Sequence, residues 1–249
     1  MVKNHLNRIA APKNWSFGRR ENRWTARPSP GPHSIKNCIT QNYILKEILN
    51  YAKTLKEVKK ILNEGNLVVD KKIRKEYNYP VGFMDVLEVP KLNEYYRVIY
   101  SADGRFILFP ITKEESKVKL LKIIKKTAVK KGKIQLTFHD GRNIVLSNFE
   151  GSVGDSALYD LEKKEISKFI SLDKGSLIYL DGGSHIGDIG KVKEIIRESD
   201  LSKPKVRVEV NGVDYITFMN YAFAIGKDKP EINLGVKQWA VWVILRLIK

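Results

Sequence analysis

Apolar and polar positions alternate with a helical period only in one part of the chain, between residues 41 and 65. Apolar side chains recur there every three or four residues, which predicts two amphipathic helices separated by a very short connection. The first should cover residues 41–52, and the second should begin after Thr54 and end at Gly65. Thr54 and Glu57 have the spacing of a capping box, which supports that start. The inward positions are Ile44, Leu45, Ile48 and Leu49 in the first helix, and Leu55, Val58, Ile61 and Leu62 in the second.

A short hairpin pattern follows these helices. Residues 66–70 predict one strand, Lys71 and Lys72 a turn, and residues 85–89 a second strand. Helices and hairpin make one expected domain, residues 41–94. Its cations gather on the polar side of the second helix and around the hairpin, where we expect them to contact phosphates. They are Lys53, Lys56, Lys59, Lys60, Lys71, Lys72, Arg74 and Lys75.

Strand patterns and turn signals dominate the middle of the chain, residues 95–172. Asp103-Gly104 and Asp140-Gly141 are hairpin turn signals, and residues 134–138 alternate as a half-buried strand does. Thr112 and Glu115 form a second capping-box pattern, which predicts a short helix. The basic run at residues 125–131 has two interpretations, a solvated sheet edge that resists aggregation or an RNA contact.

Residues 173–230 predict a third unit, a small five-stranded barrel of SH3 type. A strand at residues 177–180 precedes a glycine-rich loop, and Asn211-Gly212 gives a strong hairpin signal before a last strand at residues 222–226. Gly187 and Gly190 suit positive φ or a close backbone approach in the loop. We expect His185 to brace this loop or to contact RNA.

The two ends differ from the rest of the chain. Residues 1–40 carry one acid and four prolines, and too few aliphatic side chains for a core of their own. They are either a solvated tail or an arm that becomes ordered on RNA. We favour the arm because aromatic rings are interleaved with its basic residues. The expected contacts are Lys13, Trp15, Arg19, Arg20, Arg23, Trp24 and Arg27. Residues 231–249 form an apolar tail, too short to span a membrane, which suits a protein contact.

Composition narrows the partner. Lys and Arg number 45 against 28 acids, a net charge of +17 over 249 residues, and this excess is spread along the chain. Such a charge favours nucleic acid over a membrane surface as the partner. The single Cys38 excludes an internal disulfide and fits a reducing compartment. We expect an intracellular, cytoplasmic protein without a membrane span.

The chemistry of catalysis is hard to find in this sequence. The glycines at 182, 183, 187 and 190 fit neither a Walker loop nor a dinucleotide fingerprint. The four histidines are scattered, which argues against zinc. Asp70, Asp85, Asp140 and Asp181 stand at turns, where Asp commonly bonds the local backbone. We expect no cofactor, no metal and no enzymatic activity.

Several segments together resemble one family. Residues 43–89 resemble the S4 RNA-binding domain, and residues 79–86 resemble the variant found in the S4e family of archaeal and eukaryotic small-subunit ribosomal proteins. Residues 5–15, 27–34 and 138–143 resemble the same family, and residues 181–192 look like a KOW motif. The resemblance implies an α+β, multi-domain structural component of the ribosome. Its partners would be small-subunit rRNA, with His185 and Lys191 as further contacts, and neighbouring ribosomal proteins.

Two other classes of protein carry similar modules. S4 domains also occur on RNA-modifying enzymes such as pseudouridine synthases and methyltransferases, which need a further catalytic domain. A KOW barrel also suits an assembly or transcription factor. We favour the ribosomal role because the segments follow the family's order along nearly the whole chain.

Overall fold

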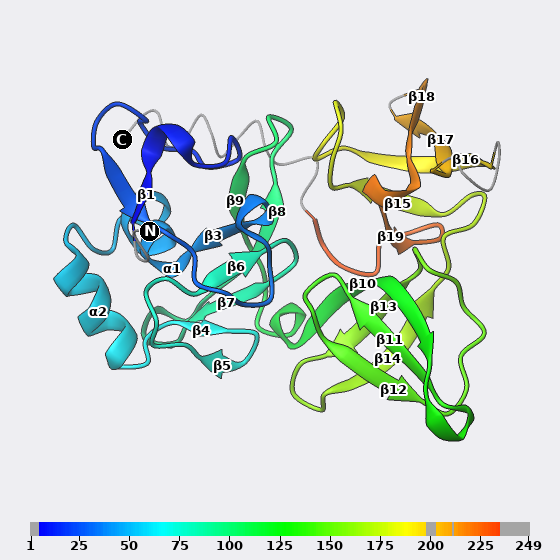
Figure 1. Ribbon diagram of the computed structural model, residues 1–249, viewed down its shortest axis with the longest axis horizontal. Coiled ribbons are helices and arrows are strands. Elements are labelled where there is room, and N and C mark those ends of the chain that lie inside the picture. The colour runs from blue at the N-terminus through cyan, green and yellow to red at the C-terminus, as the bar shows by residue number, and fades with distance from the viewer. Residues whose placement is uncertain (1–4, 198–202, 211, 235–249) are drawn as a thin grey trace.

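A computed structural model describes residues 5–197, 203–210 and 212–234. These residues are mostly β, with three five-stranded antiparallel sheets and few helices. In Figure 1 the arm, the helices and the first sheet form the left half, the third sheet lies at the upper right and the central sheet at the lower right. Asn211 and the apolar tail after Leu234 lie outside the described residues.

The helical pair is shorter than the sequence predicts. Helix α1 (Gln41–Tyr43) continues into a π-helical turn (Ile44–Ile48), and Ile44 and Leu45 are buried. This first helix does not reach residue 52, because Asn50 adopts a left-handed φ of 56° that ends the helical path.

Helix α2 (Leu55–Asn63) begins with the expected capping box. The backbone N–H of Glu57 donates to Thr54 Oγ1 at 3.3 Å, and Glu57 Oε2 accepts from the Thr54 N–H at 3.3 Å. The sequence pattern predicts that Leu55 lies on the buried face, but Leu55 is 39% exposed. The buried stripe starts one turn later, with Val58 and Leu62, because the first turn projects beyond the core.

The first sheet has the order β5-β4-β7-β8-β9 and contains both hairpins predicted between residues 66 and 109. The boundary expected between residues 94 and 95 falls inside β8. Strands β7, β8 and β9 pair continuously, so backbone hydrogen bonds join the second hairpin to the first. A two-stranded ribbon, β3 (Cys38–Thr40) with β6 (Pro80–Gly82), lies beside this sheet. The strands are β4 (Val68–Val69), β5 (Lys72–Ile73), β7 (Val86–Val89), β8 (Glu94–Tyr100) and β9 (Phe106–Pro110).

The central sheet follows a short 3-10 turn (Glu115–Lys117) that starts at the second capping box. Its order is β12-β11-β10-β13-β14. Residues 125–128 belong to β10 and pair with β11 on one side only, because the pairing of β10 with β13 ends at Lys122. This part of the basic run is therefore an edge with exposed side chains, as the first interpretation predicts. The strands are β10 (Val118–Ala128), β11 (Ile134–Phe138), β12 (Asn143–Leu146), β13 (Ser156–Asp160) and β14 (Glu165–Ile170).

The third sheet contains the five strands that the sequence predicts, in the order β18-β17-β16-β15-β19. Gly187 has a φ of 91°, and a Cβ there would lie 2.6 Å from the Ser101 carbonyl oxygen. A Cβ on Gly190 would lie 2.3 Å from Val208 Cγ1, so Gly190 permits a close approach instead. The strands are β15 (Leu177–Leu180), β16 (Ile189–Ile196), β17 (Lys205–Val210), β18 (Val213–Phe218) and β19 (Ala222–Gly226).

The N-terminal arm folds onto the protein itself, which corrects the expectation that it requires RNA for order. Strand β1 (His5–Asn7) pairs with β2 (Trp24–Ala26). The Trp15 side chain is 2% exposed, and its indole N–H donates to the Cys38 carbonyl at 2.9 Å. Its ring packs against Phe17 and Tyr43, so the core of the first domain supplies the apolar contacts that the arm lacks.

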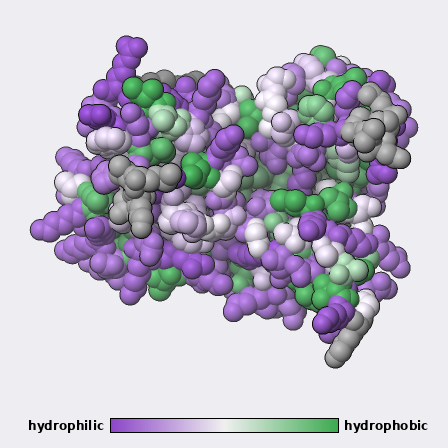
Figure 2. Space-filling view, in the orientation of Figure 1, coloured by the Kyte–Doolittle hydropathy of each residue, from purple (hydrophilic) through white to green (hydrophobic). Residues whose placement is uncertain are grey.

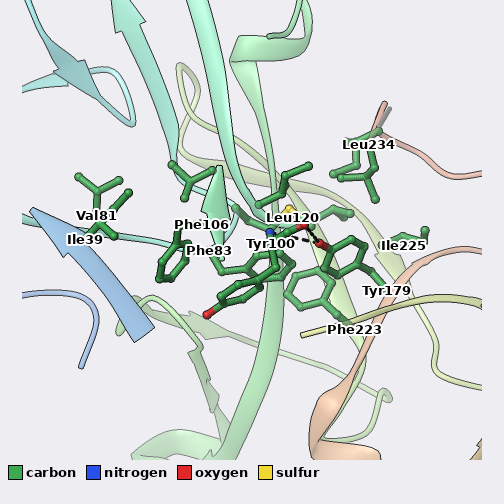
Figure 3. Packing of buried hydrophobic residues seen from close by; sticks show 14 of the residues in the cluster. Ile39, Val81, Phe83, Tyr100, Phe106, Leu120, Tyr179, Phe223, Ile225 and Leu234 are labelled. Carbon is green, nitrogen blue, oxygen red and sulfur yellow. Dashed lines mark hydrogen bonds between the residues drawn. The ribbon is translucent and has the colours of Figure 1, made fainter. Parts of the chain in front are cut away.

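Buried aromatic rings join the first sheet to the third. Phe83 stacks on Tyr100 and on Tyr179, with ring centroids 5.3 and 5.2 Å apart, and Phe223 meets Phe83 edge to face. The Tyr179 hydroxyl donates to the Tyr100 carbonyl at 2.7 Å (Figure 3). These contacts belong to one continuous core, whereas hydrophilic side chains cover much of the outer face (Figure 2).

A buried ionic cluster joins the first sheet to the central sheet. Lys119 on β10 places its Nζ 2.6 Å from Asp85, 2.7 Å from Asp70 and 3.2 Å from Asp140. Arg142 contacts Asp70 at 2.6 Å and Asp140 at 2.8 Å. Asp85 and Asp140 also accept local backbone N–H groups, from Gly82 and Arg142, as expected of Asp at turns. Asp70 instead accepts from the distant Val86 N–H at 3.0 Å. The sequence does not indicate that these turns converge.

Candidate nucleic-acid interface

Four exposed lysines lie at helix α2: Lys53 just before the N-cap Thr54, and Lys56, Lys59 and Lys60 within the helix. Burial of Val58 and Leu62 fixes the rotation of the helix, so the lysines face outward. No carboxylate in the described ranges lies within ion-pair distance of these four ammonium groups. They are therefore free to neutralise phosphates.

The β4–β5 hairpin extends this basic face. Asp70 and Lys71 both have left-handed backbones, with φ of 48° and 60°, which makes the turn tight. A Cβ on Gly65, just after α2, would lie 3.5 Å from Ile73, so the hairpin begins beside the end of the helix. Figure 1 shows α2 and the hairpin at the left of the molecule, on the same side of the first domain.

Not every hairpin cation faces solvent. Lys72 and Lys75 are exposed, and the Arg74 guanidinium lies over the Tyr79 ring, 4.7 Å from its centroid. Lys71 instead pairs with Glu88 at 2.6 Å and lies 3.7 Å from Glu162. We give the name basic face to the exposed lysines at α2 and the hairpin together with the half-buried Arg74; its members are Lys53, Lys56, Lys59, Lys60, Lys72, Arg74 and Lys75.

The arm residues divide into internal and exposed groups. Arg19 donates to the carbonyls of Arg8, Ile9, Ala11 and Pro12, at 2.9 to 3.3 Å, and so holds the arm together. Arg27 is half-buried, and Trp15 belongs to the core.

The exposed arm residues expected at RNA are Lys13, Arg20, Arg23 and Trp24. The Arg23 guanidinium lies 5.0 Å from the Trp24 ring centroid, and Trp24 is 46% exposed. This stacked pair suits contact with ribose or base.

The two RNA contacts expected in the third unit, His185 and Lys191, are not part of the basic face. His185 stacks on Tyr215, with centroids 3.8 Å apart, and its Nδ1 is 3.8 Å from Asp188, so it braces its loop. Lys191 is exposed beside a groove of about 590 Å³ that also includes Lys193 and its partner Asp214, 2.6 Å away. Figure 1 shows β16 at the opposite side of the molecule from α2, so the predicted residues form separate surfaces.

Sequence reasoning missed the buried charges between the sheets. Lys119 and Lys122 interrupt an apolar run on β10, and both are buried. A lysine within such a run could have indicated an internal ion pair, because a buried ammonium group needs a partner.

In the described part of the chain, no group of three or more His, Cys, Asp or Glu is placed to hold a metal ion. Over the same residues, no helix is long and apolar enough to cross a membrane.

Comparisons with known proteins agree with this architecture. Three family models match: the RS4NT domain at residues 2–36, the S4 domain at residues 42–87 and the ribosomal family S4e at residues 92–166. The small ribosomal subunit protein eS4 of Methanothermobacter thermautotrophicus is 42% identical, over 92% of this chain and 95% of that protein. The eS4 protein of Methanocella arvoryzae is 39% identical, over 95% of this chain and all of that protein.

A solved structure is similar as well. The crystal structure of the 30S ribosomal protein S4e from Thermoplasma acidophilum aligns with a TM-score of 0.67 and 31% identity. The alignment covers 77% of this chain and 96% of that one.

Proposed function

The chain belongs to the S4e family of ribosomal proteins, and we propose that it is a structural, non-enzymatic constituent of the small ribosomal subunit that binds small-subunit rRNA. The observation that carries the rRNA contact is the basic face. Lys53 and the three exposed lysines of α2 lack ion-pair partners among the described residues and lie within the matched S4 domain.

The proposed mechanism is electrostatic and geometric. Ammonium groups three or four residues apart on α2 follow one helix face, and the hairpin cations continue that line. Such a surface contacts the backbone of double-stranded RNA and reads its shape rather than its sequence. Neutralised phosphates then allow rRNA helices to pack side by side, and bound counterions are released, so affinity should fall steeply with salt.

Finer parts of the proposal rest on local features. The exposed Arg23–Trp24 pair supports an RNA contact by the arm. The glycine-rich loop before β16 and the five strands of the third sheet support a KOW-type, SH3-like barrel, with Lys191 as a further contact. We place the protein on the ribosome, in the cytoplasm, beside other small-subunit proteins.

The relatives favour this role over the two alternatives. A modifying enzyme or a transcription factor would share one module with this chain, whereas the matched eS4 proteins share almost their whole length with it.

Sucrose-gradient fractionation of cell lysate tests the proposal, with detection of this protein at low salt and after a high-salt wash. We expect stoichiometric retention on the small subunit in both. Loss at modest salt, or sub-stoichiometric presence with a free fraction, would contradict a structural role and favour an assembly factor, modifying enzyme or regulator.

A further inference from the structure

A cleft of about 1080 Å³ opens where the arm, the first sheet, the central sheet and the third sheet meet. Its lining includes the edges of Phe83 and Tyr100 from the aromatic cluster between the sheets, together with Lys122, His139, Asp181 and Tyr221. The basic face on α2 is not part of it. The cleft is therefore separate from the basic face, and it brings aromatic, anionic and cationic groups together.

The Asp181 carboxylate is the unusual group in this cleft. No side chain in the described ranges forms a hydrogen bond or ion pair with it, although this chain has 17 more basic than acidic residues. Burial raises the pKa of Asp181 to about 6, and the nearby Lys122 opposes that rise. At neutral pH the group is an ionised acceptor without a side-chain partner in the described part of the chain.

Lys122 faces the same cleft but does not contact Asp181. Its Nζ donates to the Asn220 carbonyl at 2.6 Å, which fixes the ammonium group and leaves other protons to donate. Asp181 and Lys122 form no ion pair within 4 Å, but both line the cleft and Lys122 is near enough to lower the pKa of Asp181, so a ligand in the cleft meets both charges. Such a ligand needs adjacent donor and acceptor atoms.

Tyr221 provides a stacking surface next to this polar pair. Tyr221 is 38% exposed, and its carbonyl accepts from the Asp181 N–H at 3.0 Å, so the two residues are neighbours in the cleft wall. Gly182 makes room for the ring, since a Cβ there would lie 2.5 Å from Tyr221 Cδ1. Bases of single-stranded RNA commonly stack on rings placed in this way.

We propose that this cleft binds an unstacked guanine of RNA, which stacks on Tyr221, donates through N1–H and N2–H to Asp181 and accepts at O6 from Lys122. The Watson–Crick edge of adenine has the opposite order, and cytosine lacks the N–H at the ring nitrogen. Uracil offers a single N–H. A base accounts for Asp181 better than a phosphate does, because an ionised phosphate has no N–H to donate to the carboxylate. The inference rests on the proposed RNA-binding function.

The test uses the full chain and fluorescein-labelled oligonucleotides of eleven nucleotides, uracil throughout except for guanine, adenine or inosine at the centre. Anisotropy titrations should show about tenfold tighter binding of the guanine oligonucleotide than of the adenine one. Inosine, which lacks the N2 amino group, should fall between them. Asp181→Asn should reduce the preference to less than about twofold, because its amide N–H₂ opposes the base donors.

Asp228→Asn is the matched control, since Asp228 is exposed and outside the cleft. It should keep the full preference, and circular dichroism should show both variants folded. Tyr221→Leu should weaken binding of the guanine oligonucleotide about tenfold.

Equal affinity for all oligonucleotides, or an unchanged preference in Asp181→Asn, would overturn the guanine site and leave the basic face as the RNA contact. If Asp181→Asn instead abolished binding of a short arginine-containing peptide and left the oligonucleotides unaffected, the occupant would be a protein and the inference would fail. Absence of binding to every oligonucleotide and to small-subunit rRNA would refute the proposed function itself.

Discussion

The ammonium group of Lys119 lies 2.6 Å from the Asp85 carboxylate, and both side chains are buried between the first and central sheets. Burial opposes both charges, yet His33 and Lys119 together hold the pKa of Asp85 far below its usual range. Asp70, Asp85 and Asp140 likewise raise the pKa of Lys119 against its burial. Both groups therefore remain charged near neutral pH, and the cluster keeps the two sheets in a fixed relation.

Replacement of Lys119 should destabilise the protein strongly. Lys119→Met leaves three carboxylates together in a buried site, and loss of one partner of a buried ion pair typically costs about 3–5 kcal/mol. The control is Lys117→Met, which removes a lysine 3.4 Å from Glu162, both about half exposed, and should change stability by less than about 1 kcal/mol. Chemical denaturation measures the stability of both variants. Equal denaturation midpoints for Lys119→Met and Lys117→Met would contradict the stabilising role of the cluster.

Charge reversal on the basic face should weaken rRNA binding without unfolding. Lys56, Lys60 and Arg74 changed together to Glu should reduce the slope of log affinity against log salt by about 2–3. Filter binding with small-subunit rRNA measures the slope, and circular dichroism checks folding. A control with Lys113, Lys163 and Lys227 reversed, all exposed and outside this face, has the same change of charge. Equal losses in both triples would show that only net charge matters.

Two tryptophans of the arm should behave in opposite ways. Trp15→Ala empties a core position and should destabilise the protein by about 3–5 kcal/mol. Trp24→Ala should leave the unfolding free energy nearly unchanged and weaken RNA binding, because that ring is exposed. Thermal unfolding and filter binding on both variants test this contrast. A stable Trp15→Ala with poor RNA binding would restore the sequence-based interpretation of Trp15.

The His139 imidazole should make stability fall in mild acid. Burial lowers its pKa to about 4 from 6.5, so between these values the unfolded chain binds a proton that the folded chain does not. Its contribution is complete above about pH 6.5 and is lost as pH falls toward 4, by roughly 1.4 kcal/mol per pH unit. The raised pKa of Asp181 acts in the opposite direction. The measurement is therefore the difference in unfolding free energy between wild type and His139→Gln, at several pH values.

As the pH falls from about 6.5 toward 4, the unfolding free energy of the wild type should fall relative to that of His139→Gln. A difference independent of pH would mean that His139 has the same pKa in the folded and unfolded chains.

Gly187 should be harder to replace than another glycine of positive φ. Gly187→Ala combines a φ of 91° with a Cβ placed 2.6 Å from the Ser101 carbonyl, so it strains the contact between the third and first sheets. Gly132→Ala has a φ of 68° but open space around the Cβ, and should cost only the left-handed penalty of about 1–2 kcal/mol. The melting temperatures of the two variants measure the two losses of stability. Equal shifts would show that the contact of the new Cβ with the Ser101 carbonyl adds nothing to the backbone penalty.

The elements themselves follow from short stretches of sequence. Thr54 with Glu57 determines the start of α2, Asp103-Gly104 determines a hairpin, and the lysine spacing places three ammonium groups on one face of α2, with Lys53 just before it. These features depend on residues within a few positions of one another, so local propensity and period suffice. The family resemblance rested in the same way on contiguous segments, and the matched proteins support it.

Only the tertiary structure decided which polar and aromatic residues serve the core. Trp15 and Arg19 look like RNA contacts by composition, but Trp15 reaches Cys38, 23 residues away, and Arg19 binds carbonyls of its own arm. Lys119 meets Asp70 and Asp85 across 49 and 34 residues. Pairings over such separations are set by how the sheets pack, because a buried charge must find its partner in space rather than along the chain.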